Sequence, residues 1–103
     1  MATRKEQLEA MLADEPGDAE LRYMLAMEHL SEGDEEGALR HFFELFDRAP
    51  DYPPAYHMAA RTLQRLDRFE EAREVLGRGI PVAQKRGDLH AAAEMQELLD
   101  NLD

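Results

Sequence analysis

The chain has no cysteine and no tryptophan among its 103 residues, and its one serine is Ser31. Without cysteine, neither a disulfide nor a thiolate metal ligand is available. With so little serine, and with no glycine-rich phosphate loop or nucleophile elbow, no catalytic constellation can be assembled. We therefore predict that the protein is not an enzyme and that it uses no cofactor.

Long hydrophobic runs are also missing. The first residues, MATRKEQLEAML, are charged from the fourth position onward and contain no apolar signal core. No later stretch is apolar for long enough to span a bilayer. These features predict a cytoplasmic protein that has no membrane partner.

Basic side chains are few: the chain has 12 lysines and arginines against 23 aspartates and glutamates, which gives a formal net charge of −11. Such a surface repels phosphates, which argues against a nucleic-acid partner. The histidines are spread over four predicted helices without the paired spacing of metal ligands, so we predict packed or surface imidazoles and no metal site. The four histidines are His29, His41, His57 and His90.

What the chain does have is an internal repeat. The stretch DEPGDAELRYMLA begins at Asp14, and RAPDYPPAYHMAA begins 34 residues later at Arg48. Apolar residues recur at the three-and-four spacing of helices, and two helices fit within each period. We therefore predict an all-α fold of six helices in one domain, residues 1–103. Its parts are a half repeat (3–15), two repeats (19–52 and 53–86) and a capping helix (88–102).

The last repeat departs from this pattern near Pro81. A proline inside a helix removes one hydrogen bond, so we expect a kink over residues 77–81, with the helix resuming through Lys85. Continuing the shift of 34 places Leu89 over Ala55 in the capping helix. The polar flank of that helix, which carries Glu94 and Glu97, is then expected to face solvent.

The residues at fixed places in the repeat resemble the tetratricopeptide repeat family. They are Leu25 and Ala26 in the first helix, the Gly33-Asp34 turn, Ala38 and Phe42 in the second helix, and the closing Pro50. The resemblance implies a right-handed α-solenoid of antiparallel helix pairs. It also implies a non-enzymatic protein–protein interaction module that binds a peptide or a partner helix in its concave groove. Arg22 and Gln84 depart from the pattern, since they replace a bulky aromatic and a third closing proline.

In proteins of that family the first helices line the concave groove, and helical spacing identifies the residues that share this face. The predicted partner-binding residues are Tyr23, Met27, His57, Arg61, Gln64, Arg65 and Met95. The set combines an aromatic, apolar side chains and arginines, which are types enriched at binding hot spots. Its arginines favour an acidic segment with an apolar anchor. The plainer interpretation is that the arginines only keep a helix soluble.

A second function stays open, because Met27, Met95 and Leu98, if exposed, offer a surface for a second copy of the chain. The protein is then a structural, self-associating repeat protein, for example a homodimer. Light scattering over a range of concentrations separates the two interpretations. A third interpretation, a small metal or ligand sensor, requires metal in the purified protein.

Overall fold

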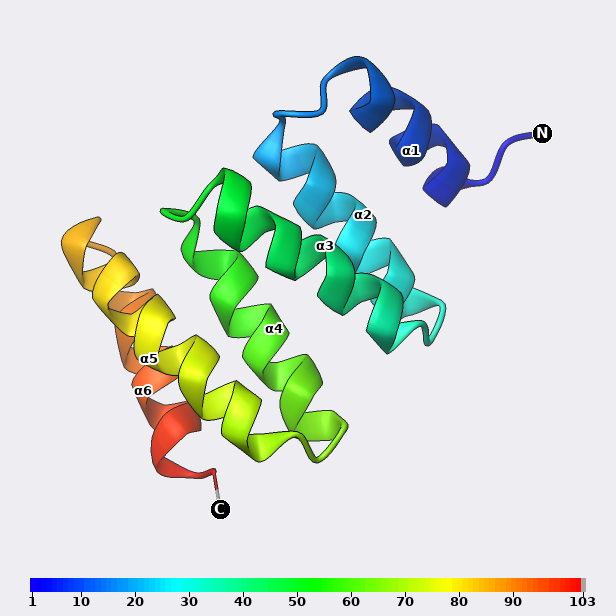
Figure 1. Cartoon of the computed structure of the whole chain (residues 1–103). Coiled ribbons are helices and arrows are strands. Elements are labelled where there is room, and N and C mark those ends of the chain that lie inside the picture. The colour runs from blue at the N-terminus through cyan, green and yellow to red at the C-terminus, as the bar shows by residue number, and fades with distance from the viewer. Residues whose placement is uncertain (103) are drawn as a thin grey trace. The chain divides into compact units, whose positions relative to one another are not determined.

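The computed structural model describes residues 1–102 and contains six helices (Figure 1). They are α1 (Arg4–Asp14), α2 (Ala19–Ser31), α3 (Glu35–Arg48), α4 (Pro53–Arg65), α5 (Phe69–Lys85) and α6 (Leu89–Asp100). The prediction of an all-α chain with six helices is confirmed. None of these helices combines the length and the apolar character that a membrane crossing requires.

Side-chain caps fix where most of the helices begin. At the start of α1, Thr3 and Glu6 form a reciprocal capping box. An aspartate side chain accepts a backbone N–H at the starts of three more helices: Asp18 for α2, Asp34 for α3 and Asp88 for α6. Each cap satisfies a donor that the helix itself leaves unpaired, and each is worth about 1 kcal/mol. Helix α4 begins instead with proline, which needs no partner for an N–H at that position.

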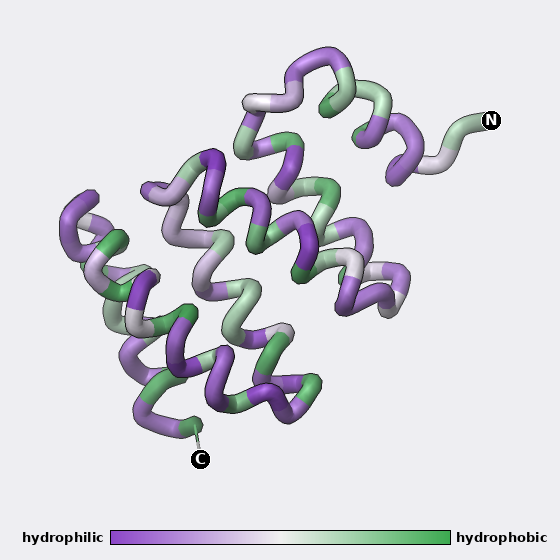
Figure 2. Tube along the Cα trace, viewed as in Figure 1, coloured by the Kyte–Doolittle hydropathy of each residue, from purple (hydrophilic) through white to green (hydrophobic). Residues whose placement is uncertain are grey.

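The helices form two compact units, which meet in sequence at Ala49 and Pro50. In the first unit α1 packs against α2, and α2 packs against α3. Leu8 and Leu12 of α1 bury their side chains with Leu25 of α2. Ala26 and Ala38 are fully buried, and such small side chains let packed helices approach closely. Figure 2 shows hydrophobic and hydrophilic segments alternating along α3, as expected of a helix with one buried face.

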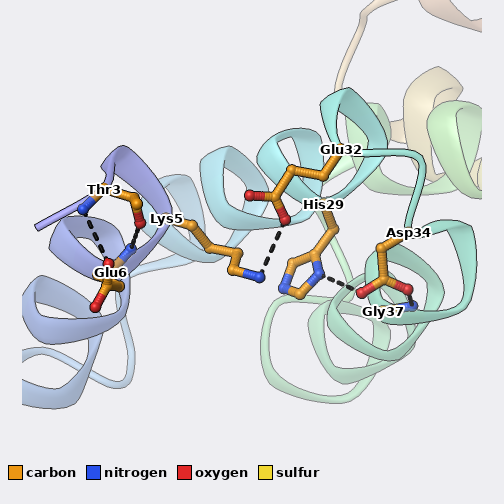
Figure 3. Close-up of polar contacts among 7 residues, drawn as sticks. All are labelled: Thr3, Lys5, Glu6, His29, Glu32, Asp34 and Gly37. Atoms are coloured by element: carbon orange, nitrogen blue, oxygen red, sulfur yellow. Dashed lines mark hydrogen bonds and ion pairs between the residues drawn. The ribbon is translucent and has the colours of Figure 1, made fainter.

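Polar contacts fasten the helices of the first unit to one another (Figure 3). Lys5 of α1 pairs with Glu32, just after α2, at 3.0 Å. The Nδ1 atom of the buried His29 lies 2.9 Å from Oδ2 of Asp34, whose Oδ1 accepts the N–H of Gly37. A Cβ atom at Gly37 would collide with both of these side chains. The turn between α2 and α3 therefore requires a glycine at position 37, in the first turn of α3.

The second unit holds α4, α5 and α6, and each of these helices packs against the other two. Its core includes Tyr56, Leu63, Leu76 and Met95, all of which are at most 1% exposed. The Tyr56 hydroxyl donates a hydrogen bond of 2.7 Å to the carbonyl oxygen of Pro50, so this ring is both packed and hydrogen-bonded. The buried ring ties the segment before α4 to the core of the unit.

Helix α5 runs without interruption through Pro81 to Lys85, and its length changes the register of α6. Helix α4 begins 34 residues after α2, whereas α6 begins 36 residues after α4. The expectation that Leu89 takes the place of Ala55 is therefore wrong: Leu89 is 72% exposed and Ala55 is fully buried. An offset of 36 instead superimposes Met95 on Ala59, and both are fully buried.

The turn between α4 and α5 contains a strained residue. Asp67 has a φ of 59°, and it lies one 34-residue period after Gly33, which has a φ of 79°. A side chain disfavours this left-handed conformation, whereas glycine adopts it freely. We expect Asp67→Gly to raise the free energy of unfolding by roughly 0.5–1 kcal/mol, after the greater chain entropy of unfolded glycine is subtracted. Urea denaturation measures the change. The reverse substitution, Gly33→Asp, should lower stability, and a destabilised Asp67→Gly protein would contradict this account.

Candidate functional site

Two of the predicted binding residues, Tyr23 and Met27, lie one turn apart on α2 in the first unit. Both side chains are half-buried. The ring centroids of Tyr23 and Phe42 lie 6.0 Å apart, and Phe42 is fully buried. Tyr23 therefore supports the packing of α2 on α3 and has only part of its surface left for a partner.

Four more predicted residues lie on α4 in the second unit. Arg61 and Arg65 are exposed, and His57 and Gln64 are half-buried. An open hollow of about 270 Å³ lies beside this helix, and its lining includes His57 and Arg61. Gln64 and Arg65 do not belong to the lining, and Arg65 instead donates to the Thr62 hydroxyl at 3.3 Å. The structure thus brings two of the four residues to one site.

The opposite wall of the hollow comes from the C-terminal part of the chain. Glu94, Glu97 and Leu98 of α6 line it, together with Asn101 just after the helix. The sequence predicts Leu98 as part of a surface for a second copy of the chain. In the structure it is half-buried and belongs to the lining of the hollow. Glu94, Glu97 and Asn101 were not assigned to the site. The 36-residue offset could have found Glu97, because it superimposes this residue on Arg61; Glu94 and Asn101 correspond to Met58 and Arg65, which lie outside the lining.

The predicted exposure of Met95 is wrong. Its side chain is fully buried. A Cβ atom built on Gly79 of α5 would lie 2.9 Å from the Met95 sulfur, so the methionine packs against the glycine backbone. The cause is the two-residue change of register, which turns Met95 toward α5. In this structure Met95 supports the wall of the hollow from within and offers no surface to a partner.

Charges of both signs face the hollow. Burial lowers the pKa of the His57 imidazole, an effect that Glu94 opposes and Arg61 reinforces. The ring is therefore neutral at pH 7. Glu94 lies 3.3 Å from the exposed His90 one turn before it. Within residues 1–102, the side chains of Arg61 and Glu97 form no hydrogen bond or ion pair, so both remain available to a ligand.

Two other hollows are less suited to recognition. One, of about 480 Å³, lies beside Pro50 and Val82, and the ion pair between Arg86 and Asp51 borders it at 3.2 Å. The other, of about 250 Å³, lies beside Met11 and Leu21 of the first unit. Neither combines an uncommitted cation with an uncommitted anion in its lining. Over the part of the chain that the structure describes, no three potential metal ligands come together.

Comparisons with known proteins agree with this architecture. A family model described as "Tetratricopeptide repeat" matches residues 29–95. An uncharacterized protein of Methanocaldococcus jannaschii is 39% identical over 64 residues, which are 62% of this chain and 74% of that protein. A solution structure from Bordetella parapertussis has a TM-score of 0.80 and 32% identity, covering 97% of this chain and 87% of its own. A tetratricopeptide repeat domain protein from Salinibacter ruber, solved by NMR, has a TM-score of 0.78 and 36% identity, with coverages of 82% and 85%.

Proposed function

Because the chain belongs to the tetratricopeptide repeat family, whose domains are generally protein-interaction modules, we propose that it is a non-enzymatic module that binds a segment of a partner protein. The site is the hollow between α4 and α6. The observation that carries the proposal is the exposed Arg61 guanidinium, which has no partner within residues 1–102 and stands over a hollow with a partly apolar lining. Arginine at such a place is a typical hot-spot residue.

The size of the hollow favours a peptide over a small molecule. Its volume of about 270 Å³ lies just below the range of roughly 300–1,000 Å³ that is usual for ligand pockets. Four of its six lining residues are exposed, so its walls cannot enclose a cofactor. One or two side chains of a partner segment, an extended peptide or a helix, match this size better.

Self-association, the alternative function, has lost part of its support. It depended on a surface of exposed apolar residues that included Met95, and this side chain is fully buried. Leu98 is half-buried within the hollow. A constant molar mass in light scattering as the protein is concentrated would leave binding of a different protein as the function.

The role of Arg61 can be tested by removing its side chain. We expect Arg61→Ala to reduce recovery of the protein that the wild type captures from its native host, because the α4 wall of the hollow loses the guanidinium donors for backbone carbonyl oxygens of the bound segment and the contact area of the alkyl chain. Quantitative mass spectrometry of the captured proteins is the measurement.

The matched control is Arg40→Ala, on the exposed side of α3 in the first unit, which changes the net charge equally. This variant should retain the partner, and circular dichroism should show both variants to be folded. Equal recovery by the Arg61 variant would place the binding site elsewhere, for example around His41 and Arg40.

A further inference from the structure

We infer that the segment bound in the α4–α6 hollow is basic: it carries a lysine or arginine next to an apolar side chain. This inference rests on the proposed function and specifies the partner. The expectation of an acidic partner considered the arginines of α4 alone. Helix α6 adds two carboxylates to the same hollow, and they change the preferred charge of the ligand.

The ionised groups of the lining are one cation and two anions. Arg61 supplies the cation, and Glu94 and Glu97 supply the anions. His57 adds no charge at pH 7, because burial lowers the pKa of its imidazole. The hollow therefore has a net negative charge, with both carboxylates on the α6 wall. A basic side chain that enters along this wall gains two attractive contacts and meets one repulsion from the α4 wall.

The two carboxylates are accessible to such a side chain. Glu97 has no partner for its carboxylate within residues 1–102. Glu94 lies beside His90, but the His90 side chain is 87% exposed, and an exposed contact of this kind contributes little. A lysine or arginine from a partner can therefore approach Glu94 without breaking a strong interaction.

The remainder of the lining suits the rest of a peptide. Leu98 provides an apolar contact beside the carboxylates. The Asn101 side-chain nitrogen donates to the Glu97 carbonyl oxygen at 2.9 Å, which fixes the amide in place. An apolar side chain adjacent to the basic one can then lie on Leu98 while its basic neighbour reaches α6.

Long-range electrostatics act in the same direction. The protein has a formal charge of −11, so its overall field attracts a basic segment and repels an acidic one. Complementary charge of this kind mainly raises the rate of association and sets the choice of partner. The local arrangement and the overall field thus favour the same class of ligand.

Two blocked pentapeptides test the inference: Gly-Lys-Leu-Lys-Gly and its counterpart Gly-Glu-Leu-Glu-Gly. They are titrated into the ¹⁵N-labelled full chain at low salt. We expect the lysine peptide to shift the amide resonances of Glu94, Glu97 and Leu98, and the glutamate peptide to leave them unchanged. The double variant Glu94→Gln with Glu97→Gln should weaken the lysine peptide by roughly three- to tenfold, the effect of losing two exposed charge contacts.

The control is Glu70→Gln with Glu74→Gln, which removes the same total charge from exposed positions on α5 outside the lining. It should weaken binding by less than about twofold, because screening limits the effect of distant charges. Equal weakening by both double variants would overturn the inference, since the attraction would then come from the whole surface. A preference for the glutamate peptide at the same resonances would also overturn it while leaving the proposed binding site intact. If neither peptide shifts these resonances, the basic-segment inference fails, and capture by the Arg61 variant still decides the proposed function.

Discussion

Deletion from Asp88 to the end of the sequence is expected to remove most of the stability of the second unit. Over residues 88–102, the deleted segment buries three side chains, those of Ala92, Met95 and Leu102, with exposures of 7%, 0% and 4%. Full burial of a methionine or a leucine contributes about 1.5–3 kcal/mol each. The loss is therefore roughly 3–6 kcal/mol, before the surface that α6 covers on α4 and α5 is counted. Whole domains are stable by only about 5–15 kcal/mol.

The truncated protein should lose more helical circular dichroism than the 12 residues of α6 account for, and it should aggregate as measured by light scattering. Point substitutions separate packing from chain length. Met95→Ser should cost about 2–5 kcal/mol, as expected when a large core side chain is cut back. Leu89→Ser, at a residue that is 72% exposed, should change stability by less than about 0.5 kcal/mol. A soluble truncated monomer with α4 and α5 intact would show that α6 is an appendage.

Local sequence signals predict the helices well because each acts within a few residues. Asp34 caps α3 and comes directly after Gly33, so the turn between α2 and α3 is readable from two adjacent letters. The 34-residue period then transfers this turn to Asp67, which adopts the same left-handed conformation without being a glycine. Ala38 and Ala72, one period apart, are both fully buried. Within these limits, sequence periodicity and packing agree.

The site is less predictable, because it depends on the register of α6. The expected continuation of the helix past Pro81 to Lys85 is observed, but the 34-residue period alone does not give the register of α6 that follows from this length of α5. The extension moves α6 by two residues relative to the period, which is about 200° of rotation for a helix with 3.6 residues per turn. Met95 consequently enters the core, and Glu97 reaches the hollow opposite Arg61. The opposite charge of the second wall results from this rotation and could not be read from α4.

Two glycines of α5, separated by one residue, should respond in opposite directions to the same substitution. A Cβ atom at Gly79 would lie 2.5 Å from Cβ of Tyr56 and 2.9 Å from the sulfur of Met95, whereas a Cβ atom at Gly77 would meet no atom within 4 Å. Tyr56 cannot yield by a side-chain rotation, because its Cβ is fixed to the backbone of α4. Gly79→Ala should therefore overpack the core and lower the free energy of unfolding by roughly 1–3 kcal/mol.

Gly77→Ala should instead raise that free energy, by up to about 1 kcal/mol, since alanine is the better helix former and nothing opposes it. Urea denaturation of the two variants and the wild type, monitored by circular dichroism, measures both changes. The comparison is matched, because both variants replace glycine with alanine in α5. The midpoints should lie on opposite sides of the wild-type value. A Gly79→Ala protein as stable as its Gly77→Ala counterpart would mean that α4 and α6 do not close on the Gly79 backbone. The wall of the hollow would then lack the rigid support that Met95 and Tyr56 are inferred to give it.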